Sequence, residues 1–287
     1  MAAVEARRSR LLSSLKADVA NSRRNDISEA HEGTFQWIFR DNLKRSWDSF
    51  IDWLKNGDGI YWINGKPGAG KSTLMKFLVG NTKTIKILEE WSSPNEPLVL
   101  TFFFWNAGVS LERNSKGLLC SLLYQLCQHD QDTLDTILLR EQSACLKDNI
   151  NDWSVSELSS LVFKYLSAIN KPVCIFLDGI DEFDRSEGLL KILALIKKLS
   201  QLKMLKLCLS SRPEPPLQQA FQNYPQLKIQ DLTEADIRSY VQTSLDGILV
   251  AGVETEKGRK TLLSISDLVI EKSEGVFLVG LHLSPSS

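Results

Sequence analysis

The sequence predicts an α/β protein, a three-layer sandwich in which helices cover both faces of a five-stranded parallel sheet. Short apolar runs alternate with longer segments of helical periodicity from residue 60 to residue 245, and strands separated by helices imply parallel crossover connections. Two of the runs, residues 98–104 and 173–177, are apolar almost without interruption. Strands that are covered on both faces have this character.

Length and charge limit the functions that need to be considered. The chain has 287 residues, enough for one large α/β domain with a helical appendage, and 34 basic against 35 acidic residues give a net charge of -1. This balance offers no electrostatic surface for nucleic acid or for an anionic membrane, and no run is apolar enough to span a bilayer. We therefore expect any anion site to be local, with no nucleic-acid partner and no transmembrane segment.

Five cysteines without a CxxC pair and three scattered histidines give no sign of a zinc site or a disulfide framework. Reduced thiols in a cytoplasmic protein are the expectation. The basic N-terminus has no secretory h-region, and a transit peptide is kept as an alternative.

The first 32 residues are expected to form a helical arm, because Leu11, Leu12 and Leu15 have helical spacing. An aromatic-rich, broadly helical stretch follows over residues 35–54. Its rings invite two interpretations, stacking on a nucleobase or packing at the edge of a core, and core packing is favoured.

The predicted elements come next along the chain. Strands are expected at residues 60–64, 98–105, 173–177, 205–210 and 227–232. Helices are expected at residues 118–127, 133–140, 155–169, 189–199, 235–245 and 256–272. Thr233 is predicted to cap the helix at 235–245. We therefore expect a core domain over residues 33–246 and a partial helical lid with a divergent tail over residues 247–287.

A phosphate-binding loop is the most specific motif of the chain. The pattern GxxxxGK[ST] follows the first strand and precedes a helical segment. Backbone N–H groups of such a loop, together with the positive end of the helix dipole, bind phosphates. The predicted nucleotide-binding residues are Gly65, Lys66, Pro67, Gly68, Ala69, Gly70, Lys71, Ser72 and Thr73. Lys71 is expected at the β- and γ-phosphates and the Ser72 hydroxyl on Mg²⁺, so the predicted ligand is Mg²⁺ with ATP or GTP.

Acidic residues end the apolar run at 173–177 and supply the carboxylates that a phosphate loop needs. We assign Asp178 to the magnesium shell. Asp181 and Glu182 are both candidates for accepting a proton from the attacking water, and the sequence does not choose between them. Arg212 ends another predicted strand, at the sheet edge where ligands gather, and is a candidate for stabilising the γ-phosphate.

These residues together resemble the NACHT domains of STAND-class signalling NTPases, in particular fungal NLR-like receptors with a nephrocystin-like NACHT region. The likeness is carried by Ala30 and His31, residues 34–39, 59–68, 102–106, 117–125, 177–182, 211–213, 232–233 and 236–237. Gly179, a small residue directly after the magnesium aspartate, is characteristic of that family.

The resemblance implies that the Arg212 strand lies between the phosphate-loop strand and the Asp178 strand. It also implies a nucleotide-controlled switch that opens and self-assembles, and that residues 31–39 border the adenine. Members usually carry an effector domain before this region and a winged helix and repeats after it, so a truncated or excised form is an expectation.

Two functions are the main candidates from the sequence, and a third, a P-loop kinase that phosphorylates a small molecule, is disfavoured because no acceptor-substrate motif is evident. The leading hypothesis is an ATP- or GTP-binding switch with slow, Mg²⁺-dependent hydrolysis that acts in immunity-like signalling through self-association or pairing with related receptors. The alternative is a non-catalytic scaffold or decoy that is stabilised by nucleotide.

Overall fold

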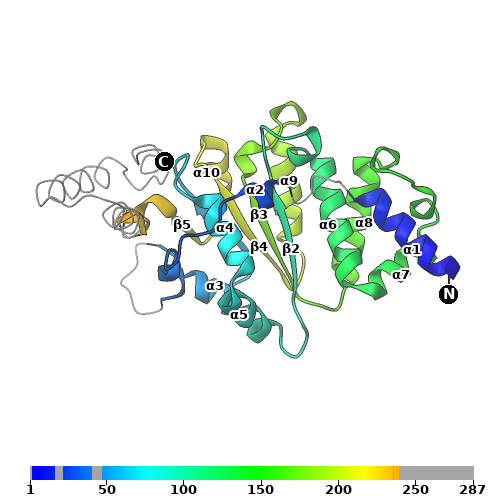
Figure 1. Ribbon diagram of the computed structural model, residues 1–287, viewed down its shortest axis with the longest axis horizontal. Coiled ribbons are helices and arrows are strands. Elements are labelled where there is room, and N and C mark those ends of the chain that lie inside the picture. Colours follow the sequence, from blue (N-terminus) through cyan, green and yellow to red (C-terminus); the bar gives the residue numbers. More distant parts are fainter. Residues whose placement is uncertain (1, 17–21, 41–46, 235, 239–287) are drawn as a thin grey trace, which may run out of the picture.

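A single parallel sheet forms the centre of the molecule (Figure 1). The computed structural model describes residues 2–16, 22–40, 47–234 and 236–238. The strands are β1 Gly59–Asn64, β2 Leu98–Phe103, β3 Val173–Asp178, β4 Leu205–Ser211 and β5 Gln226–Lys228. They lie in the order β2-β3-β4-β1-β5, and every neighbouring pair is parallel. The five-stranded parallel sheet is confirmed, and β4 lies between β1 and β3 as expected.

Helices cover the sheet on both faces, which confirms the three layers. One face carries α3 Phe50–Asn56, α4 Lys71–Gly80 and α5 Thr82–Ser92, and the other carries α6 Ser115–His129, α8 Val155–Ala168, α9 Leu189–Leu199 and α10 Pro215–Phe221. Alternate strand residues divide between the two cores: Tyr61 packs with the first group, and Ile60 and Trp62 pack with the second. Burial on both faces explains why the central strands are apolar throughout.

The N-terminal helix is docked on the outside of the second helical layer. In α1 Ala2–Leu15, the buried Leu11 and Leu15 join the core that contains α6 and α7 Gln131–Arg140. Arg8 forms a bidentate pair with Asp135 of α7, at 2.9 Å from Nε and 2.6 Å from Nη2. The helix predicted from the leucine spacing is therefore present. Short helices α2 Ser22–Asp26 and η1 Gln36–Phe39 follow it.

Aromatic side chains in the stretch before β1 mostly pack in the core, as favoured. Phe50 and Trp53 of α3 are buried, and each contacts Tyr61 of β1 through its ring. Trp37 donates from Nε1 to the Asp236 carboxylate at 2.7 Å. The stretch is helical only in part, over η1 and α3, within its described residues.

Some elements differ from the sequence-based expectation. The strand expected at 227–232 ends at Lys228, because the chain turns into the 3₁₀ helix Ile229–Asp231. Neither α5 nor α10 was expected as a separate helix; α10 begins with two prolines and is only seven residues long. A helix begins at Glu234, directly after Thr233, as the predicted cap requires.

Residues 239–245, the helix at 256–272 and the lid at 247–287 lie outside the described residues. None of the described helices is long and apolar enough to cross a membrane.

Candidate functional site

A cavity of about 580 Å³ lies at the carboxyl ends of β1, β3 and β4. Ligands of open parallel sheets bind at this edge. The loop after β1, the turn after β3, the end of β4 and the arm before η1 all contribute to its wall. The wall residues are Arg23, Asp26, Ile27, Ser28, Glu29, His31, Thr34, Phe35, Pro67, Gly68, Gly70, Lys71, Ser72, Thr73, Gly179, Asp181, Glu182, Ser210 and Arg212.

The predicted phosphate loop turns directly into helix α4. Gly70 stands before the first helical residue with φ 90°, a conformation that a side chain would strain. Lys71 opens the helix, and its Nζ donates to the carbonyl oxygens of Gly65 and Lys66, each at 2.9 Å. The cation is thus held against the loop, beside the helix N-terminus. Burial lowers the pKa of Lys71, while the carboxylates of Asp181 and Asp178 act in the opposite direction.

Most of the predicted loop residues line the cavity, and three do not. Pro67, Gly68, Gly70, Lys71, Ser72 and Thr73 are in the wall. Gly65 and Ala69 are buried behind it, and Lys66 is exposed. The backbone N–H of Lys66 donates to the Gln230 side chain at 3.3 Å, so the 3₁₀ turn after β5 supports the outer side of the loop.

Asp178 ends β3 directly behind the cavity and is 1% exposed. The Ser210 hydroxyl donates to Oδ1, whereas Oδ2 is buried and has no hydrogen-bond partner in the described chain. Burial raises the pKa of Asp178 to about 6, and the neighbouring hydroxyls of Ser210 and Ser72 oppose that rise. A buried carboxylate oxygen without a donor, close to a hydroxyl, is the oxygen set that Mg²⁺ prefers. The residues therefore fit a magnesium ion.

Asp181 and Arg212 are paired with each other in the cavity wall. The Asp181 Oδ1 accepts the backbone N–H of Arg212 at 2.9 Å, and its Oδ2 lies 3.1 Å from the Arg212 Nε. The Asp181 side chain is 5% exposed and that of Arg212 is 47% exposed. Both carboxylate oxygens of Asp181 thus hold the arginine in place. Pairing of these two candidates was not expected from the sequence.

Glu182 is fixed by a different loop. Its Oε2 accepts the backbone N–H of Asn106 at 2.9 Å, from the segment after β2. Gly179 allows the turn that presents it, because φ is 72° and a Cβ there would lie 3.2 Å from the Phe104 carbonyl oxygen. The small residue noted in the sequence is therefore needed for the backbone path between Asp178 and Glu182.

Four contributors to the site were missed at the sequence level: Ser210, Asn106, Arg23 and the segment of residues 26–29. Ser210 binds Asp178 with its hydroxyl and accepts the Gly179 N–H at 3.0 Å. Ser210, Arg23 and residues 26–29 lie outside every motif, and Asn106 belongs to the likeness at residues 102–106 but was given no role in the site. Each reaches the site through packing of distant segments.

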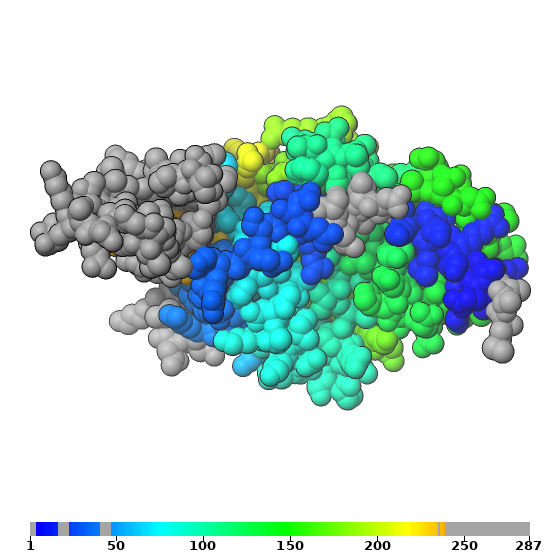
Figure 2. Space-filling model, in the orientation of Figure 1, coloured from blue at the N-terminus to red at the C-terminus, as the bar shows by residue number. Residues whose placement is uncertain are grey.

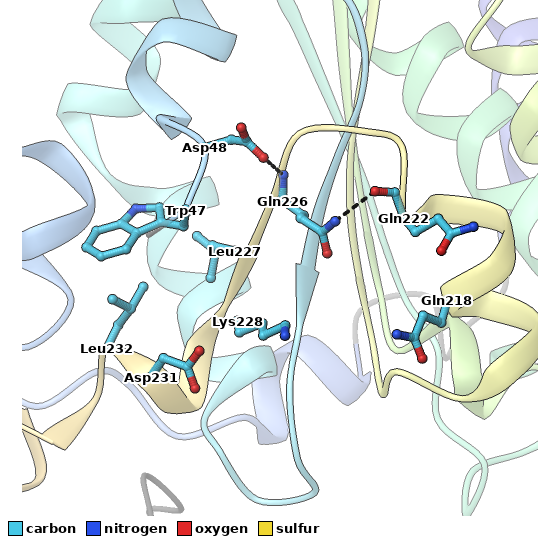
Figure 3. Close-up of a pocket in the computed structure, with 9 residues that line it drawn as sticks. All are labelled: Trp47, Asp48, Gln218, Gln222, Gln226, Leu227, Lys228, Asp231 and Leu232. Carbon is cyan, nitrogen blue, oxygen red and sulfur yellow. Dashed lines mark hydrogen bonds between the residues drawn. The ribbon is translucent and has the colours of Figure 1, made fainter. Parts of the chain in front are cut away.

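A second, larger cavity of about 730 Å³ lies beside β5 and shares none of these residues. Figure 3 shows its wall, in which the Gln226 backbone donates to Asp48 at 2.8 Å and its side chain donates to the Gln222 carbonyl at 3.0 Å. Three of its nine wall residues are glutamines: Gln218 of α10, Gln222 directly after that helix, and Gln226 of β5. It has neither the helix N-terminus nor the unpaired carboxylate of the phosphate cavity.

The fold defines a P-loop NTPase-like domain, and a family match fits one of the NACHT/STAND type. A family model described as Nephrocystin 3, N-terminal matches residues 33–212, which is more than half of the chain. The protein therefore belongs to that family. Comparison with curated protein sequences gave no match.

Comparison with solved structures gave several similar chains, including the following three. A DNA replication initiation factor is 11% identical, with a TM-score of 0.38 over 81% of this chain and 56% of that chain. Cdc6p from Pyrobaculum aerophilum is 14% identical, with a TM-score of 0.38 over 72% of this chain and 52% of that chain. Drosophila ORC bound to DNA is 12% identical, with a TM-score of 0.46 over 92% of this chain and 65% of that chain. This chain thus spans about half to two thirds of those chains.

Proposed function

We propose that this chain binds ATP or GTP with Mg²⁺ and hydrolyses the nucleotide slowly, as a switch that controls self-association in signalling. The observation that carries the proposal is the buried, unpaired Oδ2 of Asp178 beside the Lys71 cation and the N-terminus of α4. A magnesium nucleotide needs two neighbouring sites: a helix N-terminus that binds the phosphates and oxygen ligands that bind the divalent cation.

In this proposal each part of the loop has one task. Backbone N–H groups of the loop residues in the cavity wall, Gly68 and Gly70 to Thr73, surround the phosphates. Lys71 exchanges its two loop carbonyls for phosphate oxygens. Ser72 and Asp178 hold Mg²⁺, which when bound neutralises charge on the phosphate oxygens. When Mg²⁺ binds, the buried Asp178 oxygen gains a partner, and the free-energy cost of leaving it unpaired is removed. The loop and the carboxylate therefore both favour the nucleotide-bound state.

Glu182 is the proposed proton acceptor for the attacking water. Both oxygens of Asp181 are engaged by Arg212, so Asp181 acts as a positioning residue for that arginine. The Asn106 N–H orients the Glu182 carboxylate in the cavity wall. Arg212 then donates to the γ-phosphate, where charge develops during transfer.

Single-turnover hydrolysis of Mg-ATP and Mg-GTP tests these roles. Glu182→Gln is expected to keep nucleotide affinity and to lower the rate by about 10²-fold or more, the usual contribution of a general base. Asp184→Asn is the matched control, because this carboxylate follows in the same loop but lies outside the cavity wall. It caps the short helix at Arg185–Glu187 and lies 3.8 Å from the Arg113 Nε, and asparagine can still accept the capping hydrogen bond. An unchanged rate in Glu182→Gln would remove Glu182 from the chemistry.

The same experiment separates the alternative, a nucleotide-stabilised scaffold. Binding by the wild type without any turnover would favour the scaffold, and a nucleoside diphosphate that co-purifies with the protein would favour the resting switch. We also propose that the protein works in the cytoplasm, where its five free cysteines stay reduced. Nucleotide-dependent changes in molecular mass on a sizing column would test self-association.

A further inference from the structure

The segment from α2 to Glu29 packs against α4, the helix that follows the phosphate loop. Lys76 of α4 donates from Nζ to the Ile27 carbonyl at 2.6 Å and pairs with Glu29 at 2.8 Å. Ile27 is 6% exposed and packs in the same core as Leu74 of α4. In Figure 2 the blue atoms of this segment lie on the cyan atoms that follow the phosphate loop. The segment is therefore a fixed wall of the cavity.

Arg23 brings a cation to that wall. It lines the cavity together with Lys71, Glu182 and Arg212. Its guanidinium lies over the Trp105 ring, 5.5 Å from the centroid, and Trp105 directly precedes the residue whose N–H holds Glu182. A ring face attracts the charge and uses no N–H donor. The contact thus fixes the arginine and leaves its hydrogen-bonding capacity for another group.

One donor of Arg23 is conspicuously without an acceptor. Its Nε is buried and has no hydrogen-bond partner within the described residues. A guanidinium stays charged at all ordinary pH values, and a buried N–H without an acceptor is costly. An anion in the cavity would satisfy the donor and the charge together, and a guanidinium matches phosphate oxygens in a bidentate geometry.

We propose that Arg23 binds the terminal phosphate of the nucleoside triphosphate, from the side of the cavity formed by the arm. The inference rests on the proposed nucleotide binding at the phosphate loop and adds a residue outside all of its motifs. A phosphate bound by Arg23 would add a contact to those that already hold this segment on α4 through Lys76, so loss of the terminal phosphate would leave the segment less firmly held. The arm would then report which nucleotide is bound.

Titration calorimetry with three ligands tests the assignment: Mg-ATP, Mg-ADP and Mg-tripolyphosphate, which has no nucleoside. Arg23→Gln is expected to weaken ATP and tripolyphosphate about tenfold, as loss of a charge-assisted bond does, and ADP by much less. Arg23→Lys should retain part of the affinity. Arg24→Gln is the matched control in the same short helix, because Arg24 does not line the cavity.

Limited trypsin digestion gives a second readout, since Arg24 keeps a cleavage site in the arm of Arg23→Gln. Mg-ATP is expected to slow cleavage there in the wild type and not in Arg23→Gln. Circular dichroism and urea unfolding confirm that each variant is folded.

Several results would overturn the proposal. Equal ATP affinity in Arg23→Gln and the wild type would do so, as would equal protection from trypsin. Weaker ATP binding with unchanged tripolyphosphate binding would assign Arg23 to the nucleoside instead. If the wild type binds Mg-ATP no better than Lys71→Ala does, the proposed function itself fails, and this inference fails with it.

Discussion

Replacing Asp236 by alanine is expected to detach Phe35 and Trp37 from the helix that begins at Glu234. Asp236 is 7% exposed, and its Oδ2 accepts the Phe35 backbone N–H at 2.9 Å and the Trp37 Nε1–H at 2.7 Å. Alanine would leave two buried donors unpaired, at about 1–3 kcal/mol each and so about 2–6 kcal/mol of unfolding free energy together. Phe35 also lines the phosphate cavity, so nucleotide affinity should fall as well.

Asp236→Asn is the matched variant, because an amide oxygen accepts the same two hydrogen bonds. Burial raises the pKa of Asp236, although the Phe35 and Trp37 donors and the charge of Arg40 act against the rise. A carboxyl group whose pKa is raised by folding stabilises the folded state most at a pH below its unfolded pKa. This stabilisation is lost as the pH rises through the folded pKa. The asparagine variant should therefore gain stability relative to the wild type as the pH rises above the unfolded pKa of about 4.

Urea unfolding followed by tryptophan fluorescence measures both effects. At pH 7 the alanine variant should unfold at a much lower urea concentration than the wild type. The asparagine variant should unfold at the same concentration as the wild type or at a higher one. If the alanine and asparagine variants unfold at the same urea concentration, the two hydrogen bonds do not stabilise the fold and the reasoning is wrong.

Two further predictions concern the turn after β3. Gly179→Ala places a side chain at φ 72° and against the Phe104 carbonyl oxygen. The variant should lose about 1–2 kcal/mol of unfolding free energy, measured by urea unfolding, and should hydrolyse nucleotide more slowly because Glu182 moves. Stability equal to that of the wild type would contradict this prediction. Asp178→Asn relieves the cost of a buried charge whose pKa is about 6, so the variant should melt higher than the wild type in chelator at pH 7.5 but gain little from Mg-ATP. A full Mg-ATP shift in that variant would show that Asp178 does not hold the metal.

Local patterns were sufficient to predict the parallel sheet, its three layers and the loop from Gly65 to Thr73. Each of these depends on residues that are close in sequence, such as the apolar run that becomes β3 or the glycines before α4. The position of β4 between β1 and β3 came from the resemblance to NACHT domains, and the sheet order agrees.

Long-range pairings could not be predicted, because they depend on how distant segments pack. Asp236 lies 201 residues from Phe35, and no pattern links Arg23 to Trp105. Lys206 is a further example, a lysine in an apolar strand that is 1% exposed. Its Nζ donates to the Trp53 and Leu54 carbonyls at the end of α3, an acceptor pair that only the folded chain creates.

The central claim is that the loop from Gly65 to Ser72 binds a magnesium nucleotide, and titration calorimetry tests it most directly. The wild type should bind Mg-ATP or Mg-GTP, and Lys71→Ala should bind at least about tenfold more weakly, since a partly buried cation is lost from the phosphates. Lys66→Ala, an exposed lysine of the same loop that is outside the cavity wall, should bind as the wild type does. Equal affinity of the wild type and Lys71→Ala for both nucleotides would contradict the claim.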